Sequence, residues 1–156
     1  MCVIVDADVA SSVFGNPPHD DFLPVFDWLH NPKKDGSLVH GGRLTRELSG
    51  VEYVRRYLAA LNRAGRASVI PDDRVTPEED RVVAMGICKS GDAHIIALAR
   101  ISGARTLCSH DKDLHHDFTN SQLITKPKGR VYQDRSHTHL LRHTPACRGR
   151  LRRQVK

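Results

Sequence analysis

Short apolar runs alternate along the chain with longer segments in which apolar residues recur every three or four positions. The short runs predict buried strands at residues 2–5, 38–40, 69–70 and 106–108. The longer segments predict helices at 21–30, 43–50 and 51–64, a helix beginning at 76, and another from about residue 90 to 103. This alternation predicts an α/β sandwich around a central, mainly parallel sheet flanked by helices.

Two of the predicted helices have distinct boundary signals. Thr76-Pro77-Glu78-Glu79 predicts a helix start, because Thr76 can cap, proline suits the first position, and Glu79 completes a capping box. The helix that follows Ser90-Gly91-Asp92 is apolar on nearly all sides and ends before Gly103. This second pattern is typical of a central, buried helix.

Acidic residues follow two of the predicted strands. Asp6 comes directly after 2–5, and Asp111 comes shortly after 106–108. If the two strands are parallel neighbours, both carboxylates lie at the sheet edge where sites form in α/β proteins. Asp92, at the start of the buried helix, and Glu47, on helix 43–50, are further candidates. Clustered carboxylates repel one another unless a cation neutralises them, and oxygen ligands suit Mg²⁺ or Mn²⁺. The pattern favours metal-assisted phosphodiester hydrolysis.

Each of these acids also fits a simpler role when it is taken alone. An aspartate after a strand commonly forms a turn or caps a helix, and Asp92 suits the positive end of a helix dipole. Glu47 is placed to pair with Arg43 or Arg46 on its own helix. The functional interpretation therefore depends on their joint occurrence in this order.

That order resembles the PIN-domain ribonucleases, which include bacterial toxin nucleases of toxin–antitoxin pairs. The resemblance covers residues 2–118, and its most specific segments are Asp92-Ala93-His94-Ile95-Ile96-Ala97-Leu98-Ala99 and Ser109-His110-Asp111-Lys112-Asp113-Leu114. It implies a PIN-like three-layer sandwich and a Mg²⁺- or Mn²⁺-dependent endoribonuclease. The catalytic metal ligands that it implies are Asp6, Glu47, Asp92 and Asp111, with Asp8 and Asp113 as supporting acids. Asp8 departs from the pattern, since many relatives carry a small polar residue there. An antitoxin protein and a second copy of the chain are the implied protein partners.

Charge is distributed unevenly along the chain. Residues 126–156 hold ten Lys/Arg and one acid, a net charge of +9, whereas residues 1–125 hold 14 basic and 17 acidic residues, a net charge of −3. We therefore expect a PIN-like nuclease domain at 1–125 and a basic C-terminal extension at 126–156. The extension favours an RNA partner, although a solvated terminus has the same composition. The candidate phosphate contacts are Lys89, Arg148, Arg150, Arg152 and Arg153.

The remaining features narrow the location and leave some alternatives open. The longest apolar runs are only a few residues, which excludes a membrane span. The N-terminus has no basic flank, so we expect a cytoplasmic protein with reduced cysteines.

The side chains of His137, His139, His143 and Cys147 are of types that bind zinc, although a basic helix with histidines explains them as well. A DNA or structure-specific nuclease and a non-catalytic RNA-binding PIN module remain the alternative functions.

Overall fold

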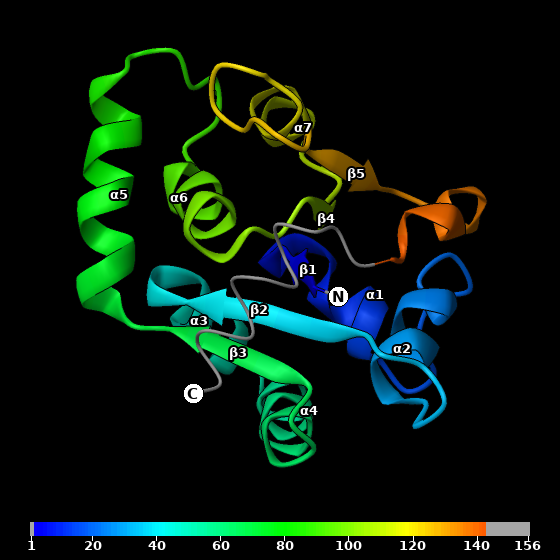
Figure 1. The fold of residues 1–156 in the computed structure, drawn as a ribbon. Helices are drawn as coiled ribbons and strands as arrows, with labels where there is room; N and C mark the ends of the chain where they lie inside the picture. The colour runs from blue at the N-terminus through cyan, green and yellow to red at the C-terminus, as the bar shows by residue number, and fades with distance from the viewer. Residues whose placement is uncertain (1, 143–156) are drawn as a thin grey trace.

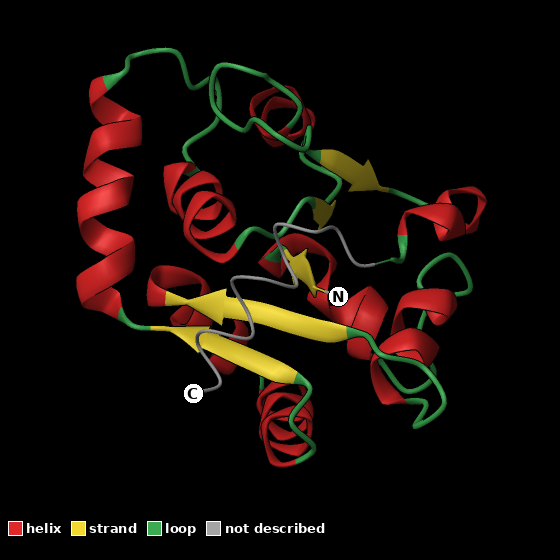
Figure 2. Ribbon diagram, in the orientation of Figure 1, coloured by secondary structure: helices red, strands yellow, loops and turns green. Residues whose placement is uncertain are grey.

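A computed structural model describes residues 2–142, which form a five-stranded sheet with helices around it (Figure 1). The strands are β1 (Cys2–Val5), β2 (Ser37–Gly41), β3 (Ala67–Ile70), β4 (Thr106–Cys108) and β5 (Arg130–Tyr132). They lie in the order β3-β2-β1-β4-β5, and every neighbouring pair is parallel. The predicted α/β class with a parallel central sheet and flanking helices is therefore confirmed (Figure 2).

Seven α-helices and two 3₁₀ helices lie among residues 2–142. They are α1 (Ala10–Phe14), α2 (Leu23–His30), α3 (Gly42–Ser49), α4 (Glu52–Arg63), α5 (Asp72–Ala84), α6 (Ala93–Ser102), α7 (Lys112–Phe118), η1 (Ala7–Val9) and η2 (Arg135–Leu140). Helix α6 is buried from Ala93 to Ala99, and Gly103 ends it with a left-handed φ of 82°. This confirms the predicted central helix. Within residues 2–142, no helix is long and apolar enough to cross a membrane.

Helix α5 begins five residues earlier than the capping pattern predicts, since its cap is Pro71 and not Thr76. Its first residue is Asp72, preceded by Pro71 in an extended conformation, and Thr76 and Pro77 lie inside the helix. The carboxylates of Asp72 and Asp73 occupy the first turn, where the helix dipole favours negative charge. The prediction of a start at Thr76 is wrong because these earlier acidic residues already begin the helix.

Strand β5 and residue Cys2 add two features that the sequence analysis did not predict. Residues 130–132 pair with β4, so the sheet extends beyond residue 125 into the basic segment. The three-residue strand β5 carries only one aliphatic residue, Val131, and such a short run has no clear strand signal.

Cys2 is disulfide-bonded, which contradicts the expectation of reduced cysteines, whereas Cys88 and Cys108 are free.

Gly129 is required where β5 meets the end of α7. A Cβ at this position would overlap the carbonyl oxygen of Phe118 and would lie 2.8 Å from Cδ1 of its ring. Because backbone must move to relieve this overlap, we expect Gly129→Ala to lower the free energy of unfolding by about 2 kcal/mol or more. Chemical denaturation measures the effect, with Gly91→Ala as the control, because a Cβ there meets nothing within 4 Å. Equal stability of both variants would contradict this account.

Candidate functional site

Two of the predicted acids follow strands that lie side by side. Strand β1 pairs with β4, with Val5 opposite Cys108, and the backbone N–H of Asp6 donates to the carbonyl of Cys108 at 2.9 Å. The predicted parallel neighbours are therefore confirmed. Asp6 and the segment that leads to Asp111 begin at the same edge of the sheet, which is its carboxyl edge.

Ser109 connects Asp6 with Asp111. Its hydroxyl donates to Oδ2 of Asp6 at 2.9 Å and accepts the backbone N–H of Asp111 at 3.1 Å. Ser109 is completely buried, and Asp6 is only 7% exposed. The sequence analysis gave Ser109 no role of its own, although its place between strand β4 and Asp111 was a usable signal. This serine holds Asp6 and positions the loop that carries Asp111.

Asp111 is both a helix cap and a member of the acidic site. Its Oδ1 accepts the backbone N–H groups of Asp113 and Leu114 at 3.0 and 3.3 Å, which caps α7. The simpler role considered for this residue is therefore real. Within residues 2–142 no hydrogen bond is found at its Oδ2, so one carboxylate oxygen remains available for a ligand.

Asp92 occupies the N-cap position of α6, yet its side chain does not cap the helix. Burial raises the pKa of its carboxyl, and the negative charges of Asp111 and Glu47 raise this pKa further, while His94 and Arg43 oppose the shift. Burial likewise raises the pKa of Asp6, to about 7, with Asp8 and Asp92 as the charges that contribute. Asp92 is thus coupled by charge to each of the other three predicted ligands, Asp6, Glu47 and Asp111, and we call these four residues the acidic cluster.

Glu47 reaches this cluster from α3 and is held by a buried histidine. Its Oε1 lies 2.9 Å from Nε2 of His94 and 3.9 Å from Nε of Arg43. Because a carboxylate only accepts hydrogen bonds, Nε2 of His94 carries the proton of this contact. His94 is 2% exposed, and its Nδ1 has no hydrogen-bond partner among the described residues. The predicted Arg43 pair exists, but the sequence analysis missed the partnership with His94.

The two supporting acids lie on the surface. Asp8 accepts the backbone N–H of His110 at 3.1 Å and contributes to the raised pKa of Asp6, so it adjoins the cluster. Asp113 is exposed in the first turn of α7. Within the described chain no hydrogen bond or ion pair joins its carboxylate to the other acids. The structure therefore places Asp8 beside the site and gives Asp113 no comparable connection.

A buried carboxylate that the sequence analysis did not single out anchors the loop before Asp92. Asp117 is fully buried and accepts the N–H groups of Lys89 and Ser90 at 2.8 and 2.9 Å, together with the Ser90 hydroxyl at 2.7 Å. That same hydroxyl accepts the N–H of Asp92 at 3.2 Å. Lys89 itself is exposed, as a phosphate contact requires. The other predicted contacts, Arg148, Arg150, Arg152 and Arg153, lie outside the described residues.

The acidic side chains are coupled by their charges, but those among residues 2–142 are not grouped into a metal site in this structure. Among residues 2–142, no three His, Cys, Asp or Glu side chains are grouped closely enough to hold one metal ion. For the zinc alternative, the ring centroids of His137 and His139 are 6.4 Å apart. His143 and Cys147 lie outside the described residues.

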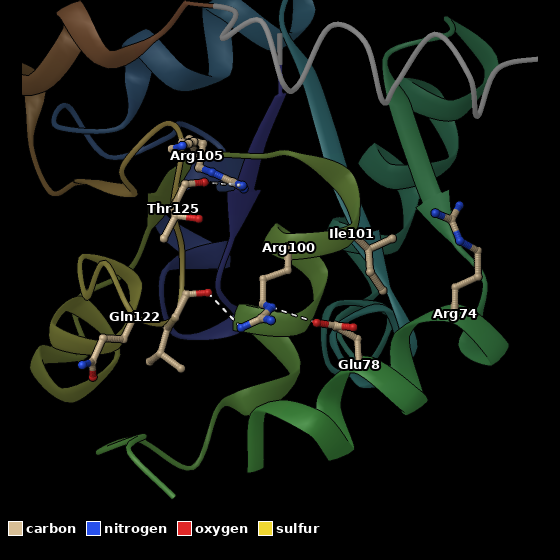
Figure 3. A pocket seen from close by; sticks show the side chains of 9 residues that line it. Arg74, Glu78, Arg100, Ile101, Arg105, Gln122 and Thr125 are labelled. Carbon is tan, nitrogen blue, oxygen red and sulfur yellow. Dashed lines mark hydrogen bonds and ion pairs between the residues drawn. The ribbon is translucent and has the colours of Figure 1, made fainter. Parts of the chain in front are cut away.

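A cavity of about 540 Å³ lies between α5, the end of α6 and residues 122–126, and none of the four predicted ligands lines it (Figure 3). Two of its three arginines are engaged in structural contacts: Nε of Arg100 lies 2.8 Å from Glu78, and Arg105 donates to the carbonyl of Thr125 at 3.2 Å. Arg105 is 6% exposed and also donates to the carbonyls of Ala99 and Pro127. Because Arg100 and Arg105 already have partners and Glu78 adds a negative charge to the lining, we assign the cavity a structural role.

Comparison of this chain with models of protein families, with curated proteins and with solved structures finds no match. Function is therefore inferred from the residues of the acidic cluster themselves.

Proposed function

We propose that this protein is a divalent-metal-dependent endoribonuclease of the PIN-like type. The observation that carries the proposal is the charge coupling of Asp92 to three other carboxylates, Asp6, Glu47 and Asp111, of which Asp6 and the segment leading to Asp111 follow neighbouring parallel strands. Burying like charges together is costly, and proteins accept this cost mainly where the charges serve a function. Ligands in open α/β sheets bind at this edge.

The donor set fits Mg²⁺ or Mn²⁺, because these ions prefer carboxylate oxygens and often retain open positions for substrate. Asp6, Asp92 and Asp111 would be the direct ligands, with Glu47 as a fourth ligand or a holder of water. Because no three of the described side chains are grouped closely enough to hold one ion in this structure, these carboxylates would have to move toward one another when the ion binds. When bound, the ion supplies positive charge that offsets the carboxylates and the phosphate and that activates water. The chain's own residues orient the donors: Ser109 holds Asp6, and His94 holds Glu47.

The substrate and partners follow from the sequence resemblance and the basic segment. RNA is the proposed substrate, and residues 126–156, with their net charge of +9, would contact its backbone. The proposal extends to a cytoplasmic enzyme that is controlled by an antitoxin protein and that pairs with a second copy of the chain.

A cleavage assay tests the catalytic assignment. The full-length chain is incubated with single-stranded RNA and Mg²⁺ or Mn²⁺, and we expect internal cleavage that EDTA stops. Asp92→Asn should lower the rate at least about 100-fold, which is equivalent to roughly 2.7 kcal/mol of activation free energy. Asp80→Asn is the matched control, since Asp80 is exposed on α5.

Three outcomes would contradict the proposal. Equal cleavage by the wild type and Asp92→Asn would indicate a contaminating nuclease. Faster cleavage of single-stranded DNA than of RNA would favour the DNA-nuclease alternative. RNA binding without cleavage under any metal condition would favour a non-catalytic RNA-binding module.

A further inference from the structure

A groove of about 630 Å³ lies between α7, β5 and η2, beside the acidic cluster. Helix α7 packs next to β5 at this edge of the sheet (Figure 1). The groove is lined by the cations Lys112, Lys128 and Arg130, and histidines line it from both α7 and η2. None of its lining residues in the described part of the chain is acidic. It is therefore a surface suited to an anion.

The three cations remain available to an external partner. Lys112, Lys128 and Arg130 are exposed, and no ion pair joins any of them to a carboxylate within residues 2–142. In the cavity near the end of α6, by contrast, Arg100 and Arg105 bind protein oxygens and Glu78 contributes a carboxylate to the lining. Unpaired cations that converge on one concave surface favour binding of a polyanion.

The groove adjoins the acidic cluster at the start of α7. Lys112, the first residue of α7, directly follows Asp111 and lines the groove. One turn further along, Nε2 of His115 lies 2.5 Å from the carbonyl of Ser109, the residue whose hydroxyl holds Asp6. Since a carbonyl only accepts, His115 donates this hydrogen bond. The groove and the acidic cluster thus meet at the N-terminus of α7, where Asp111 is the N-cap and Lys112 is the first helical residue.

On the far wall of the groove, η2 adds hydrogen-bond donors. Nδ1 of His137 accepts the backbone N–H of Gln133 at 3.0 Å, which leaves the ring's Nε2 as its donor nitrogen. Phosphate oxygens accept such N–H groups, and histidine rings also provide surfaces on which bases stack. The lining therefore offers cations, neutral donors and rings, which together suit a single nucleic-acid strand better than a lone anion.

We propose that this groove binds the backbone of the single RNA strand on one side of the bond that is cut, with Lys128 and Arg130 each contacting a phosphate. The inference rests on the proposed function, because it takes the acidic cluster as the cleavage site. It assigns the path of the strand to the β5 edge of the sheet. The opposite edge, formed by β3 and α4, would then be free of RNA (Figure 1).

Binding of labelled single-stranded RNA tests this path without any catalytic step. The measurement uses the full-length chain carrying Asp92→Asn, in EDTA, over a series of NaCl concentrations. Removing two charges with Lys128→Gln and Arg130→Gln should weaken binding about tenfold or more and reduce the slope of log K against log salt by about 1.4. The matched control, Lys33→Gln with Arg63→Gln, removes two exposed charges elsewhere on the surface, Arg63 at the end of α4.

The outcomes separate this inference from the proposed function. If the groove pair binds as the wild type does, or if the control pair loses as much affinity, the proposed path is wrong. An acidic peptide that binds equally well, with the same dependence on the groove pair, would overturn the assignment to RNA. RNA binding that depends on the groove, in a chain that never cleaves, would support the groove and reject the nuclease.

Discussion

Replacing Asp6 with asparagine should stabilise the metal-free protein at pH 8 and leave its stability unchanged below pH 4. Burial, with the charges of Asp8 and Asp92, raises the pKa of Asp6 from 3.8 to about 7. Between these two values the folded chain retains a proton that the unfolded chain releases, so the free energy of unfolding falls as pH rises. At 1.36 kcal/mol per pKa unit, the loss above pH 7 reaches at most roughly 4 kcal/mol.

Asparagine removes this penalty while its amide oxygen can still accept the Ser109 hydroxyl. Urea denaturation in EDTA, from pH 4 to pH 8, measures the difference, and Asp113→Asn serves as the control because Asp113 is exposed. Parallel stability curves for the wild type and Asp6→Asn would contradict the assigned pKa. The same substitution should abolish cleavage. A variant that is more stable and inactive cannot owe its inactivity to misfolding.

The stabilising effect of a divalent metal ion provides a second measurement that compares the wild type with Asp6→Asn. An ion that binds only the folded state raises its stability in proportion to the logarithm of its concentration. Mn²⁺ should therefore raise the melting temperature of the wild type at pH 8 more than that of Asp6→Asn. Equal shifts in both proteins would mean that Asp6 does not contribute to metal binding.

The strand-associated part of the site could be predicted from local sequence. Apolar residues 2–5 and 106–108 indicate buried strands, and in a parallel sheet the residues that follow them meet at one edge. Asp6 and the loop that leads to Asp111 are placed by this rule alone. The buried helix α6 could also be predicted from local sequence, because its apolar residues cover nearly every side of the helix.

The contacts that orient these acids could not be predicted in the same way. His94 meets Glu47 across 47 positions of the chain, and Asp117 meets Ser90 across 27. Local patterns describe the periodicity of a segment, whereas these contacts depend on how separate segments pack. A histidine in an apolar helix and an aspartate between His116 and Phe118 look ordinary until their burial is known.

Replacing Asp117, which lies outside the acidic cluster, should strongly reduce the stability of the protein. Its buried carboxylate accepts three hydrogen bonds at the 89–90 loop, and hydrogen bonds to charged groups contribute about 1.5–3 kcal/mol each. In Asp117→Asn the new amide N–H₂ would face a backbone donor, leaving both donors unsatisfied. We expect the free energy of unfolding to fall by about 2–4 kcal/mol, since such contributions are not fully additive.

The structure also predicts that the loss of stability in Asp117→Asn is accompanied by local opening at residues 89–90. Asp117 positions Ser90, and the hydroxyl of Ser90 in turn accepts the N–H of Asp92. The amides of Lys89 and Ser90 should therefore exchange hydrogen faster in Asp117→Asn than in the wild type, and this increase should be larger than at other amides of the fold. Asp113→Asn, on the same helix but exposed, should change stability by less than about 0.5 kcal/mol. Ser90→Ala, which leaves the backbone bonds to Asp117 in place, should lose less stability than Asp117→Asn but should still reduce cleavage through Asp92. Wild-type protection of the 89–90 amides in Asp117→Asn would show that this carboxylate does not position the loop.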